Sequence, residues 1–139
     1  MITYDKTITF KDYNNLRTLV GWNTVSQRQF DNAMKNPSFL TVAHNEDGLA
    51  VGMSRGVGDG GYHIMLVDVI VHPDYQGKGI GRQVVQNFMD YAYNSIEKGE
   101  SISLTLLAAY GKEKFYEKFG FHIRPVAKEG AGMNLKYTK

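Results

Sequence analysis

The sequence predicts an α+β fold in a single domain spanning residues 1–139. Apolar segments joined by turn signals in the first half of the chain indicate an antiparallel meander. A long apolar strand then leads through a glycine-rich turn into an amphipathic helix. With 139 residues, 42% of them hydrophobic and 12% aromatic, the chain is large enough for one substantial core.

The N-terminal part predicts a strand, two helices and a β-hairpin. Ser26 is the expected N-cap of the second helix, with Gln29 in the capping-box position, and Pro37 ends that helix. Asn45–Gly48 is a hairpin turn signal. The expected elements are strands over residues 2–8, 38–44 and 49–57 and helices over residues 11–20 and 26–36.

The middle of the chain predicts a strand over residues 62–72 and a helix over residues 79–97. Apolar residues recur every four positions along that helix, which is the pattern of one buried face. They are Ile80, Val84, Phe88, Ala92 and Ile96. Gly99 is the expected C-cap.

The C-terminal part predicts three strands and a short helix. Residues 101–107 alternate between apolar and polar side chains, as a half-buried strand does. A helix over residues 112–119 is stopped by Gly120, and two final strands are expected over residues 121–126 and 133–137, joined through Gly130–Gly132.

The glycine-rich turn has the properties of an anion-binding site. Backbone N–H groups converge where a helix begins. Gly77, Gly79 and Gly81 can take backbone angles closed to other residues, and they leave no side chain between the main chain and a ligand. Lys78 and Arg82 add positive charge. A dinucleotide fingerprint would need a third glycine where Arg82 stands, and a P-loop would need Ser or Thr after Lys78, so neither signature fits.

Two motifs instead resemble the GNAT superfamily of N-acetyltransferases. Gln76-x-x-Gly79-x-Gly81 is similar to its pyrophosphate-binding signature, Q/R-x-x-G-x-G/A. The segment 103–121, an apolar strand followed by F-Y-x-x-x-G-F, is similar to its second signature. The resemblance covers roughly residues 38 to 123. It implies an α/β/α sandwich with a mixed, mostly antiparallel central sheet whose middle strands splay apart around an acyl thioester.

The resemblance implies acetyl-CoA as the acyl-donor co-substrate. Its pyrophosphate would rest on the glycine-rich turn, and its pantetheine arm would pair with the strand backbone, as an added strand pairs with a sheet edge. The cofactor-binding residues expected on this basis are Val69, Ile70, Val71, Gln76, Gly77, Lys78, Gly79, Ile80, Gly81 and Arg82. The chain has no cysteine and therefore no thiolate metal site, and we expect no metal.

Tyr116 and Asp68 are the expected catalytic residues. Tyr116 occupies the signature position that serves many family members as general acid, and an unperturbed phenol keeps its proton at pH 7. The alternative for Tyr116 is a packing role. Asp68 interrupts an apolar strand, where a carboxylate is costly without partners. Several family members carry an acidic residue near this point that deprotonates the amine, often through water, so the resemblance implies that Asp68 is the base. It could instead brace backbone N–H groups, and His72 and His63 are alternative bases.

One position departs from the family pattern. Many members have Asn seven residues before the tyrosine, in contact with pantetheine, whereas this chain has Ala109 there. The expected function is acetyl transfer from acetyl-CoA to a primary amine, of a small molecule, by direct attack. A non-catalytic acyl-CoA-binding or regulatory module of the same fold is the alternative.

The remaining expectations concern partners and location. Lysines are scattered and the net charge is only +2, so we expect no nucleic acid. No apolar run reaches the ~20 residues of a membrane helix, so we expect no membrane partner. The N-terminal residues lack a signal-peptide layout, which together with the absence of cysteine favours the cytoplasm. A homodimer is possible on this sequence. Trp22 is expected either in the core or as a platform for a cation.

Overall fold

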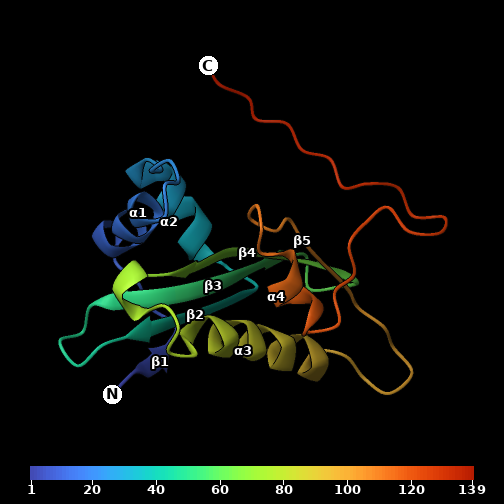
Figure 1. The fold of residues 1–139 in the computed structure, drawn as a ribbon, viewed down its shortest axis with the longest axis horizontal. Coiled ribbons are helices and arrows are strands. Elements are labelled where there is room, and N and C mark those ends of the chain that lie inside the picture. The colour runs from blue at the N-terminus through green and yellow to red at the C-terminus, as the bar shows by residue number, and fades with distance from the viewer. The chain divides into compact units, whose positions relative to one another are not determined.

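The computed structural model describes all 139 residues and divides them into two compact units. Residues Met1–Leu106 form the first unit, which contains the whole sheet and three α-helices. Residues Leu107–Lys139 form the second unit, which contains one short helix. Figure 1 shows the elements of both units.

The sheet of the first unit has five strands in the order β1-β2-β3-β4-β5. The first four strands pair antiparallel, and β5 runs parallel to β4. The sheet is therefore mixed and mostly antiparallel, as the sequence predicts. The strands are β1 (Thr3–Asp5), β2 (Phe39–His44), β3 (Ala50–Gly58), β4 (His63–Val71) and β5 (Ser103–Leu106).

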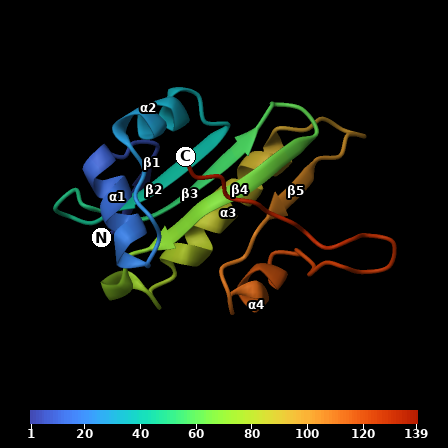
Figure 2. The ribbon, with the colours of Figure 1, turned by 90° about the horizontal axis from the view of Figure 1, so that it is seen from above.

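Helices cover both faces of this sheet. Helices α1 (Phe10–Leu19) and α2 (Gln27–Lys35) lie on one face and α3 (Ile80–Asn94) on the other, as Figures 1 and 2 show. The core between the sheet and the first two helices contains Tyr13, Leu16, Phe30, Leu40, Val42, Ala50, Met53 and Ile70. On the α3 face, Ile80 and Val84 pack with Ala43 and Val51.

The helix boundaries follow from their caps. Ser26 and Gln29 form the predicted capping box, and α2 ends before Pro37. The prediction for α3 was wrong at its C-terminus, because the helix ends at Asn94 and its C-cap is Ser95 rather than Gly99. The Ser95 hydroxyl donates to the Ala92 carbonyl at 2.7 Å, and the Ser95 N–H is shared between the carbonyls of Tyr91 at 3.0 Å and Ala92 at 3.3 Å, so side chain and backbone together close the last turn at this residue.

A β-bulge interrupts the middle of β4. Two residues of β4, Asp68 and Val69, lie opposite one residue of β3, Ser54. Asp68 takes a φ of 52°, in the left-handed region that non-glycine residues rarely adopt. The extra residue changes which side chains of β4 face α1.

Strands β4 and β5 separate beyond their first residues. They pair only from His63 to Leu66 of β4, so the β5-facing side of Val67–Val71 has no strand partner. This is the splay that the resemblance implies. The strands are not both central, however, since β5 is the edge strand of the sheet.

The prediction of two final strands was wrong, because the second unit contains no strand. Only helix α4 (Glu113–Glu117) is regular, and neither residues 121–126 nor 133–137 form a strand. Pro125 lacks the N–H that a sheet requires, and Val126 and Glu129 close a tight turn by bonding to each other. Residues 133–137 keep their apolar alternation, but Met133, Leu135 and Tyr137 are exposed and no backbone hydrogen bond pairs the segment.

Candidate active site

The turn before α3 leaves a row of backbone donors free. Gly77 and Gly79 have φ values of 76° and 84°, and Gly79 is the N-cap of α3 without a side-chain hydrogen bond. The first helical bond of the segment is from Gln83 N–H to the Gly79 carbonyl, so the N–H groups of residues 77–82 donate to no protein group. A helix start with free N–H groups attracts an anion. Gly81, in contrast, lies in α3 without a positive φ, so its predicted conformational role was wrong.

The side chains of the turn add positive charge around these donors. Lys78 Nζ lies 5.0 Å from the centre of the Tyr75 ring, and Arg82 is exposed. Gln76 uses its side-chain amide to donate to the Val71 carbonyl at 3.1 Å, which ties the turn to the end of β4. The turn and the open edge of β4 are thereby held together within one unit.

The open edge of β4 is the second part of the site. Val69, Ile70 and Val71 lie in the stretch that β5 leaves unpaired. Successive N–H groups of a strand point to opposite edges, so part of the donors and acceptors of this stretch face away from β3. An extended amide-containing ligand can pair with them as a strand would.

Asp68 lies in a half-buried cluster of charged and aromatic side chains. Its carboxylate side chain is only 8% exposed, and the bulge turns it toward α1. Tyr13 Oη donates to Oδ2 at 2.7 Å, Arg55 Nε donates to Oδ2 at 2.9 Å, and Arg17 Nη1 donates to Oδ1 at 3.3 Å. The carboxylate is thus paired by side chains, not by backbone N–H groups.

Sequence reasoning missed the three partners of Asp68. A signal was present for Arg55, which is the only charged residue in β3 just as Asp68 is the only acidic one in β4. Two lone opposite charges on neighbouring antiparallel strands predict an ion pair. Tyr13 and Arg17 are four residues apart and so share one face of α1.

Trp22 forms a cation–π contact with Arg17 of the same chain. The Arg17 guanidinium carbon lies 5.5 Å from the Trp22 ring and 5.6 Å from the Tyr13 ring, and Arg17 Nε donates to the Asn23 carbonyl at 2.6 Å. The guanidinium is therefore fixed by aromatic contacts as well as by hydrogen bonds.

The two alternative bases are engaged elsewhere. His72 Nδ1 accepts the N–H of Asp74 at 3.1 Å and so caps the short 3₁₀ turn Pro73–Tyr75. His63 is exposed at the start of β4 and packs edge-on against Tyr62. Neither ring forms a hydrogen bond or ion pair with Asp68.

Tyr116 lies on α4 in the second unit. Its ring packs edge-on against Phe115 and Phe121, and burial raises the pKa of its hydroxyl to about 12. Ala109, which stands at the family's usual Asn, is exposed and accepts the N–H of Lys112 through its carbonyl. The neighbouring Tyr110 is fully exposed and so makes no packing contact that would replace the missing side chain.

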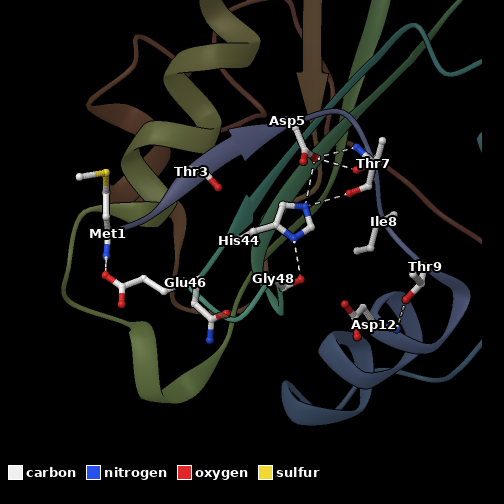
Figure 3. A pocket seen from close by; sticks show the side chains of 11 residues that line it. Met1, Thr3, Asp5, Thr7, Ile8, Thr9, Asp12, His44, Glu46 and Gly48 are labelled. Atoms are coloured by element: carbon white, nitrogen blue, oxygen red, sulfur yellow. Dashed lines mark hydrogen bonds and ion pairs between the residues drawn. The ribbon is translucent and has the colours of Figure 1, made fainter.

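A pocket of about 730 Å³ lies near the N-terminus, outside all the predicted site residues. Figure 3 shows His44 in its wall, with its ring between Asp5 and Gly48. Every acidic side chain of this pocket already has a partner. Asp5 accepts from Thr7 and His44, Asp12 accepts the N–H of Ala50, and Glu46 pairs with the N-terminal ammonium.

The mixed five-stranded sheet with helices on both faces is the fold of the GNAT acetyltransferases. A model of the acetyltransferase (GNAT) domain matches residues 36–123, and the chain belongs to the GNAT family. It is an enzyme of the N-acyltransferase class, EC 2.3.1 type, in a family that generally uses acetyl-CoA. No helix combines the length and the apolar character that a membrane crossing requires.

Solved structures and curated relatives agree with this assignment. A probable acetyltransferase of Staphylococcus aureus, SA2161, superposes with a TM-score of 0.85 at 30% identity, covering 99% of this chain and 100% of the other. The uncharacterized N-acetyltransferase ycf52 of Pyropia yezoensis is 28% identical over 123 residues, 86% of this chain and 68% of that protein. Serotonin N-acetyltransferase 2 of Oryza sativa is 32% identical over 121 residues, 84% of this chain and 58% of that protein.

Proposed function

We propose that this N-acetyltransferase moves an acetyl group from acetyl-CoA to the primary amine of a small molecule by direct attack. The observation that carries the proposal is the row of unpaired N–H groups over residues 77–82, at the start of α3 and beside the open edge of β4. Acetyl-CoA, when bound, supplies an activated acyl group. The chain has no cysteine that could hold that group as a thioester, which favours a direct transfer.

The cofactor-binding residues follow from this geometry. The N–H groups of Gly77, Lys78, Gly79, Ile80, Gly81 and Arg82 would bind the pyrophosphate, and Lys78 and Arg82 would add charge. Gln76 would hold the turn against β4 through its bond to Val71. The backbone of Val69, Ile70 and Val71 would bind the pantetheine amides.

Asp68 is the proposed base. Its Oδ1 carries a single contact of 3.3 Å, so a lone pair remains for the amine proton, taken directly or through water. The bulge that turns the carboxylate toward α1 is a strained feature of the kind that gathers at functional sites.

Tyr116 is the proposed acid, which would donate its hydroxyl proton toward the departing sulfur. A pKa of about 12 keeps the phenol protonated at neutral pH. An ordinary thiol has a pKa of about 8.5, so proton delivery requires the pKa of Tyr116 to fall when the site is loaded. We propose that residues 1–139 act as one domain, because the family match at 36–123 extends across both compact units.

A thiol-release assay with acetyl-CoA and a panel of amines tests the proposal. We expect amine-dependent release of CoA, and calorimetry should show acetyl-CoA binding that Gly79→Glu weakens. Binding of acetyl-CoA without release from any amine would instead favour a non-catalytic module, for which Ala109 leaves room. No binding of acetyl-CoA at millimolar concentration would overturn both.

A further inference from the structure

The cluster around Asp68 has an excess of positive charge. Two guanidinium groups, those of Arg17 and Arg55, share one carboxylate. The side chains of the two arginines are 18% and 16% exposed, so water screens them poorly. The remaining partners in the cluster, Tyr13 and Trp22, bring no charge of their own at neutral pH.

Much of the hydrogen-bonding capacity of these guanidinium groups is unused. Arg55 donates only through Nε, so both of its Nη groups are without a protein acceptor. Arg17 uses Nε and Nη1 and leaves Nη2 free. No buried side-chain nitrogen or oxygen lacks a partner, so solvent reaches these free nitrogens. These nitrogens are the donors that remain for a ligand.

The two guanidinium groups are also held in place before any ligand arrives. Arg17 lies against the rings of Tyr13 and Trp22 and is fixed to the Asn23 carbonyl. Arg55 extends from the middle of β3 and is anchored by its 2.9 Å bond to Asp68. A planar donor group that is already oriented loses little entropy when it binds a carboxylate or a phosphate in the bidentate manner.

We propose that the acceptor amine carries an anionic group, a carboxylate or a phosphate, which Arg55 and Arg17 bind next to Asp68. The inference rests on the proposed function for the role of the amine. Because Asp68 touches both guanidinium groups, a ligand whose amine meets Asp68 and whose anion meets Arg55 needs only a few bonds between the two. The acceptor class is thus a short zwitterion, an amino acid or an aminoalkyl phosphate.

Matched pairs of amines test the charge requirement. In thiol release, β-alanine is compared with β-alaninamide, and O-phosphoethanolamine with ethanolamine. We expect the anionic member of at least one pair to have a kcat/KM about 10-fold or more above its neutral partner. The pair that shows the preference identifies the carboxylate or the phosphate as the anion. Equal or better turnover of both neutral partners overturns the inference while leaving the proposed function intact.

Substitutions assign the preference to the arginines. Arg55→Gln should lower the anionic-to-neutral ratio of kcat/KM about 10-fold, and Arg55→Lys, which keeps a charge beside Asp68, should lower it less. Arg28→Gln is the matched control, because Arg28 is exposed on α2 and makes no ion pair, and it should leave the ratio unchanged. An unchanged ratio in both Arg55 variants, each shown by circular dichroism to be folded, overturns the inference.

Direct binding separates this inference from the proposed function. Calorimetry with β-alanine and O-phosphoethanolamine, in the presence of CoA, should detect binding to the wild type that Arg55→Gln weakens about 10-fold. That result supports the anion site even if thiol release fails with every amine. Absence of binding by both zwitterions overturns the anion site even if neutral amines are turned over.

Discussion

The hydroxyl of Tyr13 on α1 donates to Oδ2 of Asp68 on β4 over 2.7 Å, although 55 residues separate them in the chain. Both groups are largely buried, and the pKa of Tyr13 is raised by burial and by the nearby Asp68 carboxylate. The bond therefore joins the N-terminal helix to the bulge that carries the proposed base. It makes the position of Asp68 depend on the packing of α1.

Removing this hydroxyl should destabilise the protein. Tyr13→Phe keeps the ring but deletes a hydrogen bond to a charged group, so we expect the free energy of unfolding to fall by about 1.5 kcal/mol. Urea unfolding followed by circular dichroism measures it. Tyr93→Phe is the control, because Tyr93 is exposed on α3 and should show no change. A Tyr13→Phe variant as stable as the wild type would mean that Asp68 is held by its arginines alone.

A carboxylate placed at the start of α3 should block the acyl donor. Gly79→Glu puts negative charge beside the free N–H groups and adds a side chain at a φ of 84°, so we expect acetyl-CoA affinity to fall at least 10-fold. Gly99→Glu is a matched control, with a φ of 91° and open space around it, away from the turn. Calorimetry compares the two. Similar affinities in both variants would remove the pyrophosphate from this turn.

Removing the hydroxyl of Tyr116 should affect turnover more than the binding of acetyl-CoA. Tyr116→Phe should lower kcat about 100-fold or more with acetyl-CoA affinity near that of the wild type. The same variant has a signature at high pH. The pKa of Tyr116 is raised from 10.0 to about 12 in the folded protein, so its contribution to stability is complete below pH 10 and is lost as the pH rises toward 12.

Urea unfolding at pH 8 and pH 11 should therefore show a smaller alkaline loss of stability in Tyr116→Phe than in the wild type. Tyr110→Phe serves as control for both readouts because Tyr110 is fully exposed. Wild-type kcat in Tyr116→Phe would exclude the acid role and leave a packing role for the ring.

The N-terminal strand should be sensitive to acid. Burial alone would raise the pKa of Asp5, but hydrogen bonds from Thr7 and the charge of His44 outweigh it and hold the pKa below its usual value. A lowered folded-state pKa gives stability that is present above about pH 4 and is lost as the pH falls further. Asp5→Asn should flatten the decline of the melting temperature between pH 5 and pH 3. Asp31→Asn, an exposed site on α2, should leave that decline as it is in the wild type.

The local parts of the fold were predictable because their signals lie close together in sequence. The capping box of Ser26 and Gln29, the Asn45–Gly48 turn and the buried stripe of α3 each depend on residues a few positions apart. The first two are confirmed, and the stripe is confirmed from Ile80 to Ala92, whereas Ile96 lies beyond the end of the helix and is half-buried. The C-terminal strands were predicted wrongly because alternation at Met133, Leu135 and Tyr137 satisfies a pattern but supplies no partner for the backbone.

The environment of Asp68 could be predicted only in part. A polar residue in an apolar strand signals a special position, and the sequence identified it as such. The identity of its partners depends on contacts that span 55, 51 and 13 residues, and on a bulge whose left-handed backbone no local pattern announces. The conformational role predicted for Gly81 was wrong for a different reason, since its helical backbone angles are open to any residue.

The unequal surroundings of the two edges of β4 have a consequence for amide hydrogen exchange. Beyond the bulge, Ile70 and Val71 are paired with β3 along one edge, whereas the other edge has no neighbouring strand. The amides from Ile70 onward should then exchange with deuterated solvent at alternating slow and fast rates, according to the edge that each N–H faces. An extended molecule lying along the free edge would slow only the fast set, so a residue-resolved spectrum would record both its presence and its direction along the strand.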